Sequence, residues 1–409
     1  MESGSAEATS VETASSEDNA RLPSWMWVAA GLVGLAIAGL GLLLLLLSAL
    51  FPAFFAPLIV IVAGDGLIGL GLGVALVIAG YRRRRALPAQ RFSGVRGWWV
   101  FLILGLLALV AGILLPSDTH RSLLFAPVYL ALIVAPAFFF LSIVTLASGP
   151  RLSIAYPHLA LALSGGASSV LLAAPVEILG LVLSGVVTTV AAMFIPGGEG
   201  EIDRLMMLLD RWSAGPPTDP EQVLSLVASP IILATLALTL ALVTPLVEEF
   251  SKALIVGLVG FWLKPGPLSG FLWGVAAGLG FALVEGVSNG ALPLGETAGW
   301  FAGAGTRFFT TAMHGLTSGL VGLGWSYFWR RPDPRRWLLP LFYGLAALFH
   351  ALWNLNVIST LASLSLGVST PVIGGSVIVL GVVVQVTLAL GALAGLLGVP
   401  FLLKRHSTA

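Results

Sequence analysis

Apolar runs of about twenty residues or more recur along this chain, from Trp25 to Leu403. As a helix, a run of this length crosses a hydrocarbon core of roughly 30 Å. The alternating pattern of an outer-membrane barrel strand is absent. The chain is 57% hydrophobic and only 10% charged, well below the charged fraction of a soluble domain. The sequence therefore predicts an all-α, polytopic transmembrane helical bundle.

The runs predict ten membrane spans, at residues 25–49, 55–80, 98–115, 123–147, 158–195, 231–263, 268–291, 304–329, 337–358 and 373–403. Two of these segments are too long for a simple crossing. Segment 158–195 contains Pro175, and segment 231–263 contains Pro245. Because proline removes a backbone donor and crowds the preceding turn, each segment could be kinked there or broken into two pieces.

The distribution of Lys and Arg predicts the orientation of the bundle. With ten spans, 15 of these residues fall on the cytoplasmic side and four on the outer side, namely Arg121, Arg204, Arg211 and Arg307. Lys252 lies within a span. Basic residues accumulate in cytoplasmic loops, so we expect both termini to be cytoplasmic. Splitting only one of the two long segments would reverse every later loop, so either both are split or neither is.

The sequence falls into five segments. Residues 1–23 are polar and acidic and are expected to form a disordered cytoplasmic tail. They lack the basic region of a signal peptide, and the next apolar run is too long for one, so we expect the first helix to remain in the membrane. Residues 24–195 hold N-terminal membrane helices of unknown role, 196–230 an outer loop, 231–358 most of the intramembrane polar residues, and 359–409 a final transmembrane helix and short basic tail.

The outer loop contains the stretch "EIDRLMMLLDRW", which has apolar residues on one helical face. These residues are Ile202, Leu205, Met206, Leu209 and Trp212. The pattern fits an amphipathic helix at the membrane interface and, equally well, a helix packed on the residues of the loop itself. "TDPEQV" predicts a further helix start, with Asp219 as the cap and Pro220 at the first helical position.

Eight ionisable residues lie well inside the predicted spans, away from the span ends: Asp65, Glu177, Glu248, Glu249, Lys252, Glu285, His314 and His350. A charged side chain at mid-bilayer costs about 2.5–3.5 kcal/mol on insertion scales, so such residues are functional candidates. Asp65 and Glu177 stand alone in their spans, where structural pairing, pore lining or closeness to an interface explains them best. The other six are concentrated in four consecutive spans, which indicates a shared site.

Helical spacing groups these residues further. At about 100° per residue, Lys252 lies between Glu248 and Glu249 around the helix and can pair with either. The pairs that share a face in the next three spans are Phe281 with Glu285, His314 with Ser318, and His350 with Asn354. Each of these spans therefore presents a titratable or hydrogen-bonding group on one face.

Carboxylates and imidazoles around a wet cavity can activate water for hydrolysis. A glutamate accepts the proton, and a histidine orients the water or protonates the leaving group. An asparagine or a protonated histidine can donate to a developing oxyanion. Cysteine and HExxH are absent, and no GxSxG elbow appears: the one stretch that reads GxSxG, "GVSNG" at 286–290, lies inside a predicted membrane span rather than between a strand and a helix. Glu285, His314, His350 and one of Glu248 or Glu249 could also hold a divalent metal, so both metal-free and metal-assisted hydrolysis remain open.

At these residues the chain resembles the PrsW family of intramembrane proteases, and more distantly the CAAX-prenyl-protease and bacteriocin-processing group. The family pattern is EExxK, FxxxE, a His followed by a small residue, and HxxxN. Here these motifs read "EEFSK", "FALVE", "HGLTS" and "HALWN", in order and on consecutive spans. The resemblance covers residues 231–358 and identifies them as the PrsW-like protease core.

The resemblance implies peptide-bond hydrolysis within or near the membrane. The residues it implies for the site are Glu248, Glu249, Glu285, His314, His350 and Asn354, with Lys252 in structural pairing. Family members have been described both as glutamic proteases and as metalloproteases. We favour the metal-free mechanism, because the glutamates and histidines suffice to activate water. In the alternative, a divalent metal such as zinc would be bound by Glu249, Glu285, His314 and His350.

The family's best-known role is the cleavage of a membrane-anchored anti-sigma factor. We therefore expect a membrane-anchored protein substrate, an anti-sigma factor or another regulator, for an enzyme of the cell membrane. No basic patch interleaved with aromatic residues appears outside the loops, so no nucleic-acid partner is expected. The sequence does not indicate an oligomeric state.

Two other functions fit part of this pattern. Proton-coupled transporters also bury Glu, Lys and His and use broken helices, although their inverted repeats are not found here. A non-catalytic membrane scaffold would not need the complete polar set.

Overall fold

The computed structural model describes residues 52–85, 91–92, 97–115, 126–149, 154–213, 226, 228–290, 297–330, 333–369 and 371–408. The predicted tail 1–23, the predicted span 25–49 and the stretch "TDPEQV" lie outside these residues. Within them the fold is helical, apart from the antiparallel pair of two-residue strands β1 (Arg91–Phe92) and β2 (Ile154–Ala155). The predicted all-α class is confirmed for this part of the chain.

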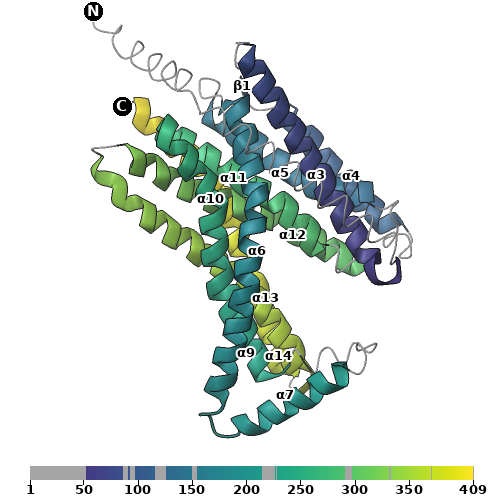
Figure 1. Ribbon diagram of the computed structural model, residues 1–409. Coiled ribbons are helices and arrows are strands. Elements are labelled where there is room, and N and C mark those ends of the chain that lie inside the picture. The colour runs from purple at the N-terminus through teal and green to yellow at the C-terminus, as the bar shows by residue number, and fades with distance from the viewer. Residues whose placement is uncertain are drawn as a thin grey trace, which may run out of the picture. The chain divides into compact units, whose positions relative to one another are not determined.

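The helical elements follow the predicted spans closely (Figure 1). In chain order they are α3 (Pro52–Arg84), α4 (Trp98–Leu114), α5 (Ala126–Ser148), α6 (Tyr156–Ala192), α7 (Gly198–Ser213), α9 (Pro230–Leu238), the π-helical turn η3 (Thr239–Val243), α10 (Thr244–Leu263), α11 (Pro267–Gly290), α12 (Thr297–Trp329), the 3-10 turn η4 (Pro334–Trp337), α13 (Leu338–Ser369) and α14 (Pro371–Thr408).

Seven helices among the described residues are long and apolar enough to cross a membrane. They lie in α3, α5, α6, the stretch from α9 to α10, α11, the stretch from η4 into α13, and α14. Helix α4 has only 17 residues, and α12, which carries Arg307 and His314, is not among the seven. The protein is therefore a multi-pass membrane protein, while the predicted count of ten spans is not confirmed.

Neither of the two long segments is split. Helix α6 runs without a break over 37 residues with Pro175 inside it. The second segment continues from α9 through η3 into α10. Its irregularity is the π turn at 239–243, and Pro245, two residues further on inside this continuous run, removes one backbone donor. The charge distribution allowed either both segments or neither segment to be split, and the structure corresponds to the second alternative.

The chain divides into two compact units, and several helices contribute residues to both. Unit 1 contains residues up to Val170, Phe250–Ala346 and Ala392–Ala409. Unit 2 contains Leu171–Glu249 and Ala347–Gly391. The boundary in α10 falls between Glu249 and Phe250, within the "EEFSK" motif, so this helix brings polar residues to each unit.

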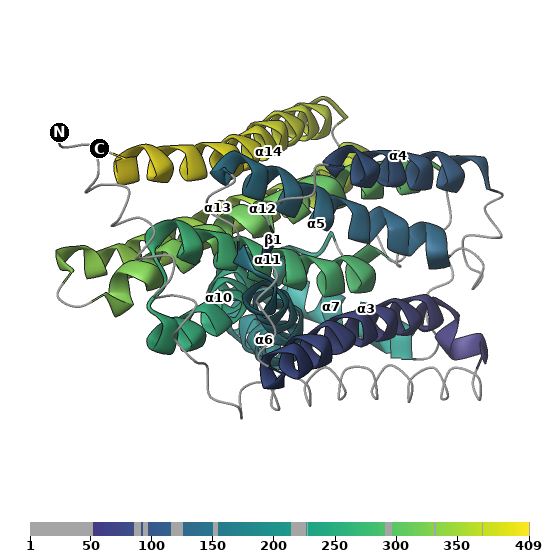
Figure 2. The same ribbon diagram turned by 90° about the horizontal axis from the view of Figure 1, so that it is seen from above.

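Unit 1 is built around α11, which packs against α3, α5 and α12 (Figures 1 and 2). Glycines let the neighbouring backbones approach closely. A Cβ atom on Gly274 would lie 2.9 Å from the Cα atom of Gly319 in α12, and one on Gly280 would lie 3.0 Å from the Cα atom of Leu163 in α6. The Tyr129 hydroxyl in α5 donates to the Gly286 carbonyl at 2.7 Å. These contacts fix the helix that carries Glu285.

Unit 2 contains the predicted amphipathic segment, which forms α7. Leu205 is buried with Leu226 and Ile231, and Ile202 packs against the same cluster. The second interpretation, packing on the residues of the loop itself, therefore fits the contact with Leu226, while Ile231 lies just beyond the loop. Met206 and Leu209 of the same helix are exposed. The amphipathic pattern thus covers both a packed face and an exposed apolar one.

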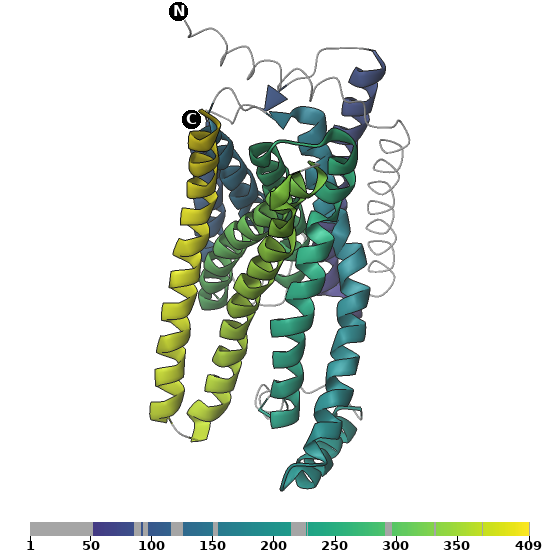
Figure 3. The ribbon, with the colours of Figure 1, turned by 90° about the vertical axis from the view of Figure 1, so that its left-hand side faces the viewer.

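The rest of unit 2 is held together by hydrogen bonds between helices. The hydroxyls of Thr188 in α6 and Thr235 in α9 lie 2.6 Å apart. Helices α13 and α14 run side by side (Figure 3), and the Asn356 amide donates to the Gln385 side-chain oxygen at 2.7 Å. In an apolar surrounding such pairs satisfy polar groups that lipid cannot.

Candidate active site

The predicted site residues lie on four helices and are divided between the two units. Helix α10 carries Glu248, Glu249 and Lys252, α11 carries Glu285, α12 carries His314, and α13 carries His350 and Asn354. Lys252, Glu285 and His314 belong to unit 1, and the other four belong to unit 2. Within each unit the structure brings a glutamate and a histidine into direct contact.

In unit 1, Lys252 is completely buried and contacts two side chains from other helices. Its Nζ atom lies 2.7 Å from Nδ1 of His314 and 4.3 Å from the ring centroid of Phe281. The Phe281 and His314 rings meet edge-on at 5.4 Å. Phe281 of the "FALVE" motif therefore packs against both polar residues. His314 is a partner for Lys252 that helical spacing along α10 did not predict.

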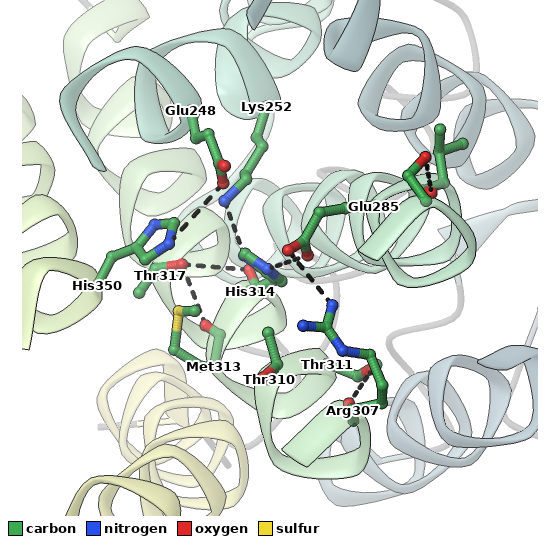
Figure 4. Close-up of polar contacts among 12 residues, drawn as sticks. Glu248, Lys252, Glu285, Arg307, Thr310, Thr311, Met313, His314, Thr317 and His350 are labelled. Atoms are coloured by element: carbon green, nitrogen blue, oxygen red, sulfur yellow. Dashed lines mark hydrogen bonds and ion pairs between the residues drawn. The ribbon is translucent and has the colours of Figure 1, made fainter. Parts of the chain in front are cut away.

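The contacts of His314 determine its tautomer (Figure 4). An ammonium group can only donate, so Nδ1 of His314 accepts from Lys252. The proton is then on Nε2, which lies 2.8 Å from Oε2 of Glu285 and donates to it. Both ring nitrogens are thus engaged, and the imidazole links a cation on one side to a carboxylate on the other.

Arg307 also belongs to this cluster, although the distribution of Lys and Arg along the chain predicted it on the outer side. It lies inside α12, and its Nη1 atom is 3.3 Å from Oε1 of Glu285 (Figure 4). It precedes His314 by seven residues, which places the two side chains within about 20° of each other around the helix. That spacing is a signal in the sequence by which Arg307 could have been found.

In unit 2, His350 lies between two glutamates. Oε1 of Glu249, which is completely buried, lies 2.8 Å from Nδ1 of His350. Oε2 of Glu248 lies 3.9 Å from Nε2, beyond hydrogen-bonding length (Figure 4). With Glu249 ionised, the His350 proton is on Nδ1 and Nε2 presents its lone pair toward Glu248. This is a carboxylate–imidazole pair with a second carboxylate close to the other ring nitrogen.

Asn354 contacts backbone in this structure. Its Nδ2 atom donates to the carbonyl oxygen of Leu240 at 2.8 Å, inside the π turn η3. A π turn departs from the regular i to i+4 bonding pattern, so a side-chain donor at this point helps to satisfy its carbonyls. Asn354 therefore connects α13 to the turn that leads into the helix of Glu248 and Glu249.

Asp65 and Glu177 lie away from these two groups of contacts. Asp65, in α3, lies close to Ser288 of α11, whose hydroxyl donates to the Val284 carbonyl at 3.1 Å. The preceding residue, Gly64, allows α3 to approach Val287, whose Cγ2 atom would lie 3.3 Å from a Cβ added at this position. Glu177 lies on α6 in unit 2 and is half-buried.

The donor types present could hold a metal ion. Glutamate and histidine side chains, among them Glu248, His314 and His350, are the ligand types of catalytic zinc sites, where a water completes the coordination. Glu248 and His350 belong to unit 2 and His314 to unit 1. Because Lys252 occupies Nδ1 of His314 and Glu285 occupies Nε2, His314 could bind a metal only after one of them moved.

Apolar membrane helices that bury carboxylates against imidazoles are compatible with a membrane-embedded hydrolase. The family described as PrsW family intramembrane metalloprotease matches residues 159–390, more than half of the chain. The chain belongs to this family, which confirms the resemblance seen in the four motifs. It is therefore a member of a family of intramembrane peptidases and an integral, multi-pass membrane protein. No curated protein gave a match. No solved structure matched either.

Proposed function

We propose that this protein hydrolyses a peptide bond of a membrane-anchored protein, using water activated by glutamate and histidine. The observation that carries the proposal is the contact of Glu249, completely buried, with Nδ1 of His350, while Glu248 lies 3.9 Å from Nε2. An oxygen atom at about 2.8 Å from both Nε2 and Oε2 fits that spacing. A water in that position would have a proton acceptor and an orienting imidazole.

The three residues of this cluster then have separate roles. Glu248 accepts the proton of the attacking water as the general base. Glu249 holds the His350 ring in one orientation, as the carboxylate of a catalytic triad does. His350 orients the water, takes this proton from Glu248 at Nε2, and delivers it to the leaving amine, which leaves both groups as they began. Membrane burial supports this chemistry, because hydrogen bonds and charges act more strongly where bulk water is excluded.

We further propose that the cluster of unit 1 acts in the same reaction. Helix α10 carries Glu248 and Lys252 one turn apart, and the four family motifs include residues of both clusters. With neutral histidines, Glu248 and Glu249 contribute two negative charges, while Lys252, Arg307 and Glu285 sum to one positive charge. A cationic cluster supplies a donor for the oxyanion that develops during attack. Lys252, or His314 when protonated by it, is the proposed donor.

A metal-free mechanism is the version we favour, because each residue in this scheme has its own proton-transfer or hydrogen-bonding role. In the alternative, a divalent ion such as zinc would be held by glutamate and histidine ligands, His314 among them, and would supply Lewis-acid activation of the water. Lys252 would then release Nδ1 of His314. The metal content of the purified protein, compared with that of His314→Ala by mass spectrometry, separates the two versions without reference to activity.

The test of the function is cleavage of single-span membrane proteins co-expressed with wild type, Glu249→Gln or His350→Ala. We expect cleavage by the wild type, and none by either variant, with normal insertion and abundance. Glu177→Gln is the matched control, because it also removes a glutamate from a membrane helix of unit 2. Full cleavage by both cluster variants would refute the assignment. Loss of cleavage in the control as well would show that the glutamates matter for folding rather than for chemistry.

A further inference from the structure

Arg307 is the member of the unit 1 cluster that none of the four motifs contains. Its side chain is 19% exposed, and its partner Glu285 is 17% exposed, so both lie largely away from solvent. Arg307 and His314 come from the same helix, two turns apart, and each holds a different oxygen of the Glu285 carboxylate. Both oxygens of the Glu285 carboxylate therefore accept hydrogen bonds from the same helix, α12.

Besides compensating the charge of Glu285, this arrangement determines which groups of the cluster donate hydrogen bonds and which accept them. A guanidinium retains its positive charge, so Arg307 is a permanent donor to Oε1. With Oε1 engaged, Oε2 is directed to His314, whose Nε2 donates to it at 2.8 Å. That hydrogen bond places the proton on Nε2 and leaves Nδ1 as the acceptor for Lys252. With Lys252 charged, the order of donors and acceptors from Arg307 to Lys252 therefore has one consistent solution.

We propose that Arg307 is a positioning residue for the hydrolysis. It orients Glu285, which in turn sets the ring orientation and tautomer of His314 and so the direction of Lys252. The inference rests on the proposed function and adds to it a residue outside the family motifs. A purely structural role predicts something different: less folded protein after mutation, with normal turnover by each molecule that does fold.

The primary test is the turnover of Arg307→Gln and Arg307→Lys in proteoliposomes, expressed per folded molecule. Misplacement of a catalytic group by about 1 Å can cost about 100-fold in rate, and we expect a loss of about 10- to 100-fold in kcat for Arg307→Gln. KM, measured as the substrate fraction in the bilayer, should stay unchanged. Arg307→Lys keeps the charge and should recover part of the loss. The control is Arg330→Gln, an exposed arginine just beyond the other end of α12.

A double variant shows whether Arg307 acts through Glu285. If it does, adding Arg307→Gln to Glu285→Asp lowers kcat by much less than it does in the wild type, because coupled residues are non-additive. Equal losses in both backgrounds would overturn the proposal, as would a wild-type kcat in Arg307→Gln. A raised KM with normal kcat would assign Arg307 to substrate binding instead. If Arg307→Gln does not fold, or if Glu285→Asp has no measurable turnover, the test rests on Arg307→Lys. A lower kcat at unchanged KM in this variant supports the positioning role, and a wild-type kcat refutes it.

These outcomes are distinct from failure of the proposed function. If Glu249→Gln cleaves as well as the wild type, the hydrolytic assignment itself is wrong. If Glu249→Gln is inactive while both Arg307 variants match the wild type, only the role of Arg307 is wrong.

Discussion

The substitution Gly278→Ala should separate α11 from α12 at the point where these helices bring Glu285 and His314 together. A Cβ atom on Gly278 would lie 2.7 Å from the carbonyl carbon of His314 and 2.8 Å from Oγ of Ser318. Ordinary van der Waals contacts of a Cβ begin at 3.4 Å, so the two backbones must part by at least about 0.7 Å. Overpacking of this kind costs about 1–3 kcal/mol of stability.

The displacement acts directly on the cluster of unit 1. Glu285 follows Gly278 by two turns of α11, and its Oε2 atom lies only 2.8 Å from Nε2 of His314. A shift of about 0.7 Å brings that hydrogen bond to the limit of its useful length. Misplacement of a catalytic group by about 1 Å can cost about 100-fold in rate, so we expect kcat to fall by about 10- to 100-fold.

The assay is cleavage of a model substrate in proteoliposomes at several substrate fractions, with thermal unfolding measured in parallel. Gly305→Ala is the matched control, because it lies on α12 and a Cβ there meets nothing within 4 Å. We expect the control to retain its turnover and to gain up to about 1 kcal/mol of helix stability. Wild-type kcat in Gly278→Ala would show that the reaction does not depend on this approach of α11 and α12.

Three further predictions concern the π turn, the topology and the cleavage point. Asn354→Ala leaves the Leu240 carbonyl without its side-chain donor, so we expect faster amide exchange around the π turn and reduced cleavage; unchanged exchange with full activity would contradict the positioning role. A phosphatase reporter that works only outside the cytoplasm should be inactive when fused after Ala409, and an active fusion would reverse the predicted orientation. The substrate should be cut on its outer, membrane-proximal side, with deletion of residues 201–213 changing rate or selectivity; mass spectrometry that places the cut on the cytoplasmic flank would refute the predicted depth or topology.

The sequence by itself determined the class of fold and the identity of the motif residues. Apolar runs long enough to cross a membrane predict helices, because such a helix satisfies its backbone hydrogen bonds internally. Polar residues inside those runs carry a large insertion cost, so Glu248, Glu249, Glu285, His314 and His350 were conspicuous in sequence. Spacing along a helix also placed Asn354 on the face of His350. These inferences need only local periodicity and composition.

Tertiary structure decided which side chains meet. Lys252 contacts His314 across two helices, and Arg307, which was counted on the outer side of the bundle, is a partner of Glu285. Asn354 donates a hydrogen bond to a carbonyl of the π turn. The sequence indicated an irregularity at Pro245 but did not predict this turn. The physical reason is the same in each case. Helical periodicity says which residues share a face, but the facing of one helix toward another depends on side-chain packing and close glycine contacts between helices, which emerge only when the chain is folded.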